Sequence, residues 1–253
     1  GSGARDWLDV IMAGRIPKPG RLALNPMLSP KGKLIGDFTV SCISDQEFMV
    51  TASFGMQAAH LRWFESHLPS DGTVEIENIS TKRIGFQIAG PKARELLSRV
   101  AFEDVSSDKF KFLDIKETAI GTCMALVQRV SYTGDLGFEI YVRAEEQIAL
   151  YNTLAEAGKD LGLKPFGMRA MMSLRLEKSF GSWGREFRPD YMPVETGMDR
   201  FTSYKKPADF IGKQAALKEK EEGASRRLCT FVVDAIDADV WGDEPIWHEG
   251  KVV

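Results

Sequence analysis

The segment from Ser131 to Val142 constrains the fold of this chain more than any other, because it predicts two strands joined by a tight reversal. If the loop spans Gly134 to Gly137, Tyr132 lies directly opposite Glu139. Opposed residues of an antiparallel hairpin share a face, with Cβ atoms about 5 Å apart. A phenol and a carboxylate would then project side by side and could hydrogen-bond a flat, nitrogen-rich ligand, while Phe138 and Ile140 would turn to the other face as core. A surface hairpin with incidental polar residues is the alternative that the spacing leaves open.

Composition excludes several classes of protein. The chain has 253 residues, of which 43% are hydrophobic and 27% charged, as expected for a soluble globular protein. Its net charge is −3 and no block of like charges occurs, so we expect no nucleic-acid partner. There is no apolar run long enough to span a membrane. The three cysteines form no CxxC pair and the three histidines lack zinc-like spacing, so we predict a reducing compartment and no metal site.

Periodicity predicts a mixed α+β fold. A similar glycine-alanine-arginine-acid-leucine pattern at residues 1–8 and 90–97 suggests two related lobes, each with a glycine-bounded turn that enters a helix. Strands are predicted over residues 36–44, 73–80, 83–89, 122–131, 138–142 and 229–234. Helices are predicted over residues 4–13, 56–67, 92–100 and 145–161, after Asp209, and, as a buried helix, over residues 168–178. Residues 179–204 form a long aromatic loop, in which we interpret Trp183, Phe187 and Tyr191 as loop core rather than ligand contacts.

Asp37 lies inside a β-type run directly after Gly36, where aspartate is disfavoured. A bulge or a solvent-facing strand end would explain it without function. The functional explanation is a carboxylate held in a pocket as a general base or as a stabiliser of a cation. The residues alone leave these explanations open.

Five segments in order resemble the folate-dependent aminomethyltransferase superfamily, which includes the T-protein of glycine cleavage and the C-terminal parts of sarcosine and dimethylglycine dehydrogenases. They are MLSPKGKLIGDFTV, IAGPKARELL, SYTGDLGFEI, SLRLEKSFGSWGREF and DFIGKQAA. The resemblance implies a cloverleaf of two ferredoxin-like lobes plus the start of a C-terminal β-barrel, enclosing tetrahydrofolate. By position, Asp37 matches the acid beside the reacting folate nitrogens, and Tyr132 and Glu139 match folate-binding residues, with Glu139 against the pterin.

One departure selects a branch of that superfamily. Met171 and Met172 stand where glycine-cleavage proteins carry an Arg-Asp pair, so a guanidinium that could meet the folate tail is absent there. Arg169 and Arg175 are the candidate substitutes. The run from residue 168 to 201 is instead similar to the dimethylglycine and sarcosine dehydrogenases. In that branch FAD belongs to a separate N-terminal oxidase domain, which we expect to be missing from these residues.

The sequence thus predicts folate-binding lobes over residues 1–200, followed by a linker helix and a truncated barrel module over residues 201–253. The predicted activity is capture of an iminium or formaldehyde equivalent as 5,10-methylenetetrahydrofolate, in the cytoplasm or the mitochondrial matrix. The expected partners are a small-molecule substrate and the FAD-binding oxidase domain of the full protein. A stand-alone aminomethyl or methyl transferase and a non-catalytic folate-binding module are the alternatives. The amine donor and the oligomeric state are left open.

Overall fold

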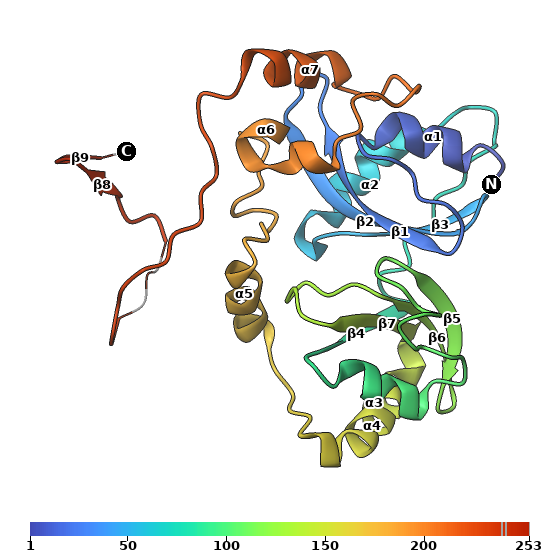
Figure 1. Ribbon diagram of the computed structural model, residues 1–253. Coiled ribbons are helices and arrows are strands. Elements are labelled where there is room, and N and C mark those ends of the chain that lie inside the picture. The colour runs from blue at the N-terminus through green and yellow to red at the C-terminus, as the bar shows by residue number, and fades with distance from the viewer. Residues whose placement is uncertain (239, 241, 253) are drawn as a thin grey trace.

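The computed structural model describes residues 1–238, 240 and 242–252, and shows the α+β fold that periodicity predicts (Figure 1). The first lobe carries a three-stranded antiparallel sheet in the order β1-β2-β3. Its elements are α1 (Ala4–Ile11), β1 (Arg21–Leu28), β2 (Leu34–Ser44), β3 (Glu47–Thr51), η1 (Phe54–Met56) and α2 (Gln57–Ser66). Both helices cover the same face of this sheet (Figure 1).

Strand β2 has two chemically different faces, because successive side chains of a strand point in opposite directions. Phe38 and Val40 are fully buried against Leu8 and Ile11 of α1. Asp37 and Thr39 therefore point to the opposite face, away from the helices. The burial of the apolar set fixes the register of β2, and that register sends a carboxylate toward the second lobe.

The second lobe is a four-stranded antiparallel sheet in the order β4-β7-β6-β5, with two helices packed on one face. Phe138, Ile140 and Val142 of β7 are fully buried against these helices, which confirms the prediction that this face of the strand is core. The elements are β4 (Arg83–Ala89), α3 (Ala93–Val100), β5 (Ile115–Ile120), β6 (Cys123–Gln128), β7 (Gly137–Arg143), η2 (Ala144–Glu146), α4 (Gln147–Ala157) and η3 (Lys159–Leu161).

A short seam of backbone hydrogen bonds joins the two lobes. The amide of Leu22 donates to the carbonyl of Leu113, and the amide of Ile115 donates to the carbonyl of Gly20, both over 2.9 Å. Between them Arg21 and Asp114 form a β-bridge and an ion pair. The seam holds the free face of the first sheet against the free face of the second along this side, with Leu22, Met49, Ile115 and Leu126 packed between them.

After the second lobe, the chain passes through α5 (Met168–Glu177) and returns to the first lobe (Figure 1). The returning elements are α6 (Pro193–Thr196), η4 (Met198–Phe201) and α7 (Lys213–Glu222). The buried Lys206 fixes this return, because its Nζ donates to the carbonyls of Asp9, Met12 and Gly14 just past and within the end of α1. Cationic groups at a helix C-terminus satisfy carbonyls that the helix leaves free.

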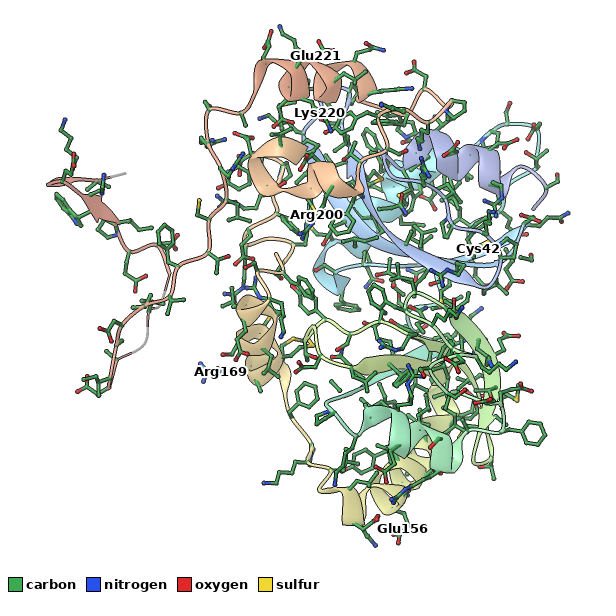
Figure 2. All side chains as sticks on the ribbon, in the orientation of Figure 1. Cys42, Glu156, Arg169, Arg200, Lys220 and Glu221 are labelled. Atoms are coloured by element: carbon green, nitrogen blue, oxygen red, sulfur yellow. The ribbon has the colours of Figure 1, made fainter. Side chains whose placement is uncertain are left out.

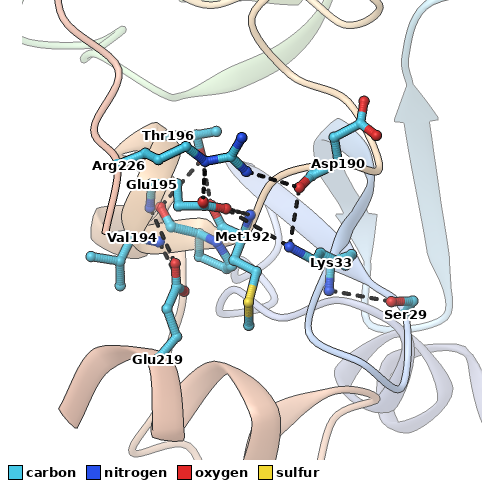
Figure 3. A network of polar contacts seen from close by, with 10 residues as sticks. Ser29, Lys33, Asp190, Met192, Val194, Glu195, Thr196, Glu219 and Arg226 are labelled. Carbon is cyan, nitrogen blue, oxygen red and sulfur yellow. Dashed lines mark hydrogen bonds and ion pairs between the residues drawn. The ribbon is translucent and has the colours of Figure 1, made fainter. Parts of the chain in front are cut away.

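Figure 3 shows a polar network that fastens α6 to α7. The Glu219 carboxylate accepts the backbone N–H groups of Val194 and Glu195, which lie in the first turn of α6. Glu195 in turn accepts from Arg226, and Lys33 of the β1–β2 connection donates to the carbonyl of Asp190. Burial raises the pKa of Glu219, and the two backbone donors partly oppose that shift.

Several predicted elements are wrong. Residues 73–80 and 229–234 form no strand, although both are described. β-rich composition makes a strand only where a neighbour supplies the hydrogen bonds, and the tail has none: Val232 is 99% exposed. Strand β1 was not predicted because it contains Pro26, which is tolerated at the sheet edge. Helix α5 forms as predicted but is not buried, since only Arg175 within it is.

The cloverleaf and the C-terminal barrel stay predictions. Beyond α7, the described residues contain only the short strands β8 (Trp247–His248) and β9 (Lys251–Val252), which pair with each other. Figure 1 shows this tail extending away from both lobes. Its apolar side chains, including Phe231 and Val232, are exposed.

Candidate functional site

Asp37 is placed by a β-bulge. Met27 pairs with Gly36, whereas Leu28 pairs with Leu34, so one extra residue is inserted two positions before Asp37. Bulges re-aim the side chains beside them. Gly36 is required there, because a Cβ at this position would lie 2.3 Å from the Phe38 ring. The bulge that the sequence offered as an alternative to function is therefore present, and it sets the direction of the carboxylate.

Burial raises the pKa of Asp37 from its ordinary value of 3.8 to about 6, against a smaller lowering by its own backbone N–H. No cation of the described chain forms an ion pair with this carboxylate. A carboxyl with a pKa near 6 is mostly ionised at neutral pH yet basic enough to take a proton, which is the balance that general-base catalysis needs.

Tyr132 does not lie opposite Glu139, and the predicted hairpin register is wrong. Strand β6 ends at Gln128, which is the residue that pairs with Glu139. The chain leaves the sheet early because the hydroxyls of Ser131 and Thr133 hydrogen-bond each other over 2.8 Å and the amide of Gly134 bonds back to Ser131. Side chains of this type compete with the strand ladder and favour turns.

Tyr132 nevertheless reaches the Asp37 region from the loop over residues 129–136. Its hydroxyl donates to the carbonyl of Gly181 over 2.8 Å. Burial raises the pKa of this phenol. The Ser182 side chain and the positive charge of Arg175 oppose that rise, and the negative charges of Asp37 and Glu186 add to it. Tyr132 and Asp37 therefore lie within electrostatic range of each other, although they come from different lobes.

Glu139 lies on β7 and points to the same free face of the second sheet. Its carboxylate accepts a hydrogen bond of 2.8 Å from the hydroxyl of Tyr141, two residues further along the strand. Burial raises the pKa of Glu139, while this hydrogen bond lowers it. Tyr141 also interacts with the hydroxyl of Thr51 on β3 of the first lobe. Glu139 is thus linked through one tyrosine to the opposite sheet.

Asp37 and Glu139 lie on the facing sides of the two sheets, and Tyr132 lies in a loop within electrostatic range of Asp37. Thr51 pairs with Thr39, which follows Asp37 by two residues and shares its face. A polar strip therefore runs from Glu139 across Tyr141 and Thr51 toward Asp37, and the loop with Tyr132 closes on the same region. Such a strip offers hydrogen-bond acceptors for a polar ring at one end and a basic carboxylate at the other.

Arg169 and Arg175 were the predicted substitutes for the absent guanidinium, and neither presents a free guanidinium to this strip. Arg175 is 2% exposed in its side chain and forms an ion pair of 2.6 Å with Glu186. The same guanidinium donates to the carbonyls of Phe180 and Met172, so it organises the loop after α5. Arg169 is exposed, and Figure 2 shows it on the outer side of α5. Phe187 is buried and Trp183 is partly buried in one cluster with Leu34 and Met198, as predicted for loop core, whereas Tyr191 lies outside that cluster.

Two cavities of the described chain lie outside the strip. One, of about 380 Å³, is bordered by the β1–β2 connection and α7. The larger, of about 850 Å³, follows the free edge of β4 between α3, α4 and residues 161–168. Among the described residues no group of three or more His, Cys, Asp or Glu side chains could bind a metal ion. None of the helices in this part of the chain is long and apolar enough to cross a membrane.

Comparison with solved structures defines the class of this fold. The chain superposes on the glycine cleavage system aminomethyltransferase T from Bartonella henselae with a TM-score of 0.77, covering 90% of this chain and 61% of that one, at 24% identity. The fold is therefore that of an aminomethyltransferase. Residues 1–206 match the family described as the GCVT N-terminal domain, and the chain belongs to that family.

Curated relatives carry two kinds of name. Dimethylglycine dehydrogenase, mitochondrial, from Homo sapiens is 42% identical over 97% of this chain and 28% of its own length. An aminomethyltransferase from Natranaerobius thermophilus is 33% identical over 85% of this chain and 58% of its own length. The chain thus spans about three-tenths of the dehydrogenase and under two-thirds of the transferase. The predicted superfamily is confirmed, and its members include enzymes of both names.

Three polar residues in or beside the strip were not predicted from the sequence. Tyr141 and Thr51 connect the two sheets, and Gln128 is the true partner of Glu139. Tyr141 carried a signal, because it follows Glu139 by two residues within a strand and must share its face. No sequence signal pointed to Gln128, because the predicted loop began at Gly134 and therefore placed Tyr132 opposite Glu139.

Proposed function

We propose that this chain is a tetrahydrofolate-binding one-carbon transfer domain of an N-methylglycine-type dehydrogenase. The observation that carries the proposal is the partly buried acidic pair on facing sheets, with Asp37 on β2 and Glu139 on β7. Tetrahydrofolate supplies the nucleophilic nitrogen that takes up a one-carbon unit, and the proposed product is 5,10-methylenetetrahydrofolate. The 42% identity to a dimethylglycine dehydrogenase supports this donor class.

The residues present fit a folate. A pterin edge carries adjacent N–H donors, and a carboxylate accepts such paired donors. Glu139 is a partly buried carboxylate with one hydrogen bond from the protein and further acceptor capacity. A second sign of fit is the buried, unpartnered hydroxyl of Ser41 on the same face of β2 as Asp37. Polar groups of this kind are costly in an empty protein and expected where a polar ligand binds.

Each residue then has a chemical role. Asp37 accepts the proton that is lost at the reacting nitrogen, and its negative charge stabilises a cationic one-carbon donor beside it. Tyr132 orients the ring from the loop that faces Asp37, and Glu139 fixes the pyrimidine end. Holding both reactants between two rigid sheets supplies proximity and orientation. FAD would belong to a further domain of the full protein, which produces the iminium.

The alternatives differ in testable ways. A stand-alone aminomethyl transferase of the same fold needs Asp37 but another donor, and the relative named aminomethyltransferase supports it. A non-catalytic folate module needs Glu139 only. We further propose the division into lobes over residues 1–200 and a following segment over 201–253, and a location in the mitochondrial matrix, which the printed name of the dehydrogenase relative supports.

Titration calorimetry of tetrahydrofolate under anaerobic, reducing conditions tests the proposal. We expect micromolar binding by the intact chain and a loss of at least tenfold for Glu139→Ala, about 1.4 kcal/mol or more. Glu117→Ala is the matched control, since Glu117 is an exposed glutamate on β5 of the same sheet. If the folded chain does not bind tetrahydrofolate, the proposed function is refuted and the chain shares only the fold of its relatives. Binding with unchanged transfer in Asp37→Asn would instead favour the non-catalytic module.

A further inference from the structure

Gln128 is a buried amide without partners. The residue is 0% exposed, and neither its Nε2 nor its Oε1 has a hydrogen-bond partner. Among the buried polar side chains of the described chain it alone has two unpaired polar atoms, one donor and one acceptor. An amide that loses water without gaining partners destabilises a fold, so protein interiors rarely retain one without another role.

Gln128 lies beside Glu139, at one end of the polar strip. Strand pairing sets it directly opposite Glu139, and directly opposed residues share a face. Leu126, two residues earlier, lies in the apolar cluster between the sheets, which confirms that this face of β6 points toward the first lobe. The carboxylate and the amide therefore stand on neighbouring strands, about 5 Å apart at the backbone.

Gln87 provides an internal comparison. It lies opposite Glu139 on the other side, on β4, so the sheet carries the row Gln87, Glu139, Gln128. The Gln87 amide already has a hydrogen-bond partner, because its Nε2 donates to the Ser131 hydroxyl over 3.1 Å. Two glutamines flank the same carboxylate, and only the one on β6 is left unpaired at both atoms.

A second unpaired group lies on the facing sheet. The Ser41 hydroxyl is 0% exposed and has no partner. Ser41 pairs with Leu22 and Met49, which belong to the same inter-sheet cluster as Leu126. Unpaired polar atoms thus border this space from both sheets, as a ligand spanning it requires.

We propose that Gln128 is a ligand-binding residue that contacts the edge of the pterin ring beside Glu139. This inference rests on the proposed function. A carboxylate accepts two hydrogen bonds from a 2-amino-4-oxopyrimidine, one from its amino group and one from the adjacent ring N–H. An amide one strand away then faces the 4-oxo oxygen, to which its N–H donates, while its own oxygen accepts the next ring N–H of the reduced pterin. Both unpaired atoms of Gln128 are satisfied at once.

The test compares Gln128→Met with the unchanged chain and with Thr118→Val. Methionine preserves length and volume but removes both polar atoms. Thr118 is a buried polar residue of the same sheet whose hydroxyl does have partners, the amide of Glu103 and the carbonyl of Ala119. Calorimetry with tetrahydrofolate and competition by 6-methyltetrahydropterin, the ring without its tail, give the affinities. Thermal unfolding of the free proteins gives the stability.

Two results together identify a ligand-binding role. Gln128→Met should bind tetrahydrofolate at least tenfold more weakly, and the ring fragment should lose affinity by the same factor. Its free form should unfold at the same temperature as the unchanged chain or higher, because the substitution removes an unsatisfied amide. Thr118→Val should unfold at a lower temperature and bind normally, since it loses satisfied hydrogen bonds away from the ligand.

Other results overturn the inference. Unchanged tetrahydrofolate affinity in Gln128→Met shows that the amide does not touch the ligand. Weakened tetrahydrofolate binding with unchanged competition by the ring fragment places the contact away from the pterin. A fall in unfolding temperature that accounts for the lost binding assigns Gln128 a structural role. If the unchanged chain is folded and binds no folate, the proposed function fails first, and this inference fails with it.

Discussion

Replacing Asp37 by asparagine should stabilise the folded chain at neutral pH while it removes the proposed base. The pKa of Asp37 is about 6 in the fold and 3.8 without it, a difference of about two units caused by burial. A folded pKa above the unfolded one means that the native state binds the proton more tightly. The contribution of this group to stability is therefore greatest below the unfolded pKa and is lost as pH rises through about 6.

The magnitude follows from that shift. Each pKa unit corresponds to about 1.4 kcal/mol, so keeping Asp37 ionised in the fold costs about 3 kcal/mol above pH 7. Roughly half of that cost, about 1.4 kcal/mol, develops between pH 5 and pH 8. Asparagine has nearly the same shape and carries no charge. Asp37→Asn should therefore be more stable by about 3 kcal/mol at pH 8, which for a chain of this size is a rise in Tm of roughly 6–12 °C.

Urea unfolding at several pH values between 5 and 8 measures this effect for both proteins. Asp108→Asn is the control, because Asp108 is an exposed aspartate in the loop before β5 and should alter the pH profile little. The reasoning would be refuted by a stability difference that stays constant over this pH range, or by an Asp37→Asn variant less stable than the unchanged chain at pH 8. Either result would mean that the carboxylate is compensated in the fold.

Three further substitutions probe the elements that hold the strip in place. Arg175→Ala leaves the carboxylate of Glu186 without its buried partner and should cost about 3–5 kcal/mol in urea unfolding; an unchanged midpoint would show that the pair is dispensable. Lys206→Met removes the donor that three carbonyls near the end of α1 share, and should lower the free energy of unfolding by about 2 kcal/mol, whereas a cost near zero would mean that water replaces the ammonium. Glu219→Ala uncaps the first turn of α6 and should cost about 1–2 kcal/mol by thermal unfolding, with Glu222→Ala, an exposed glutamate of the same helix, as the control.

Sequence patterns predict this chain well wherever one face of an element is apolar. The helices α1, α3 and α4 and the core face of β7 were found because burial imposes a period of 3.6 or 2 on them. Strand β1 was not predicted because it contains Pro26, which is rare within strands. Helix α5 was predicted to be buried because its methionines resemble the apolar stripe of a core helix. Local composition does not reveal which neighbour an element will have.

The candidate site shows the same limit. Asp37 was identified from its improbable place in a strand. The structure shows it partly buried with a pKa raised to about 6, and its catalytic role stays a prediction. The pairing of Tyr132 with Glu139 was wrong, because two hydroxyl side chains turn the chain before the glycines do. A hairpin register depends on where the first strand ends, and a shift of that end changes every opposed pair. Gln128 becomes visible only with the correct register.

The seam between residues 20–22 and 113–115 and the clamp by Lys206 have a consequence for biosynthesis. The second lobe, residues 83–157, is contiguous and can fold as soon as it leaves the ribosome. The first lobe must wait twice: its sheet lacks its seam until residue 115 emerges, and the end of α1 stays unsecured until residue 206 does. Contacts between residues so distant in sequence carry a large loop-closure cost and form late. Within these residues, the part that is synthesised first is therefore among the last to be fixed in place, and nascent chains that end before Lys206 should expose the helix-facing core of the first lobe to chaperones and proteases.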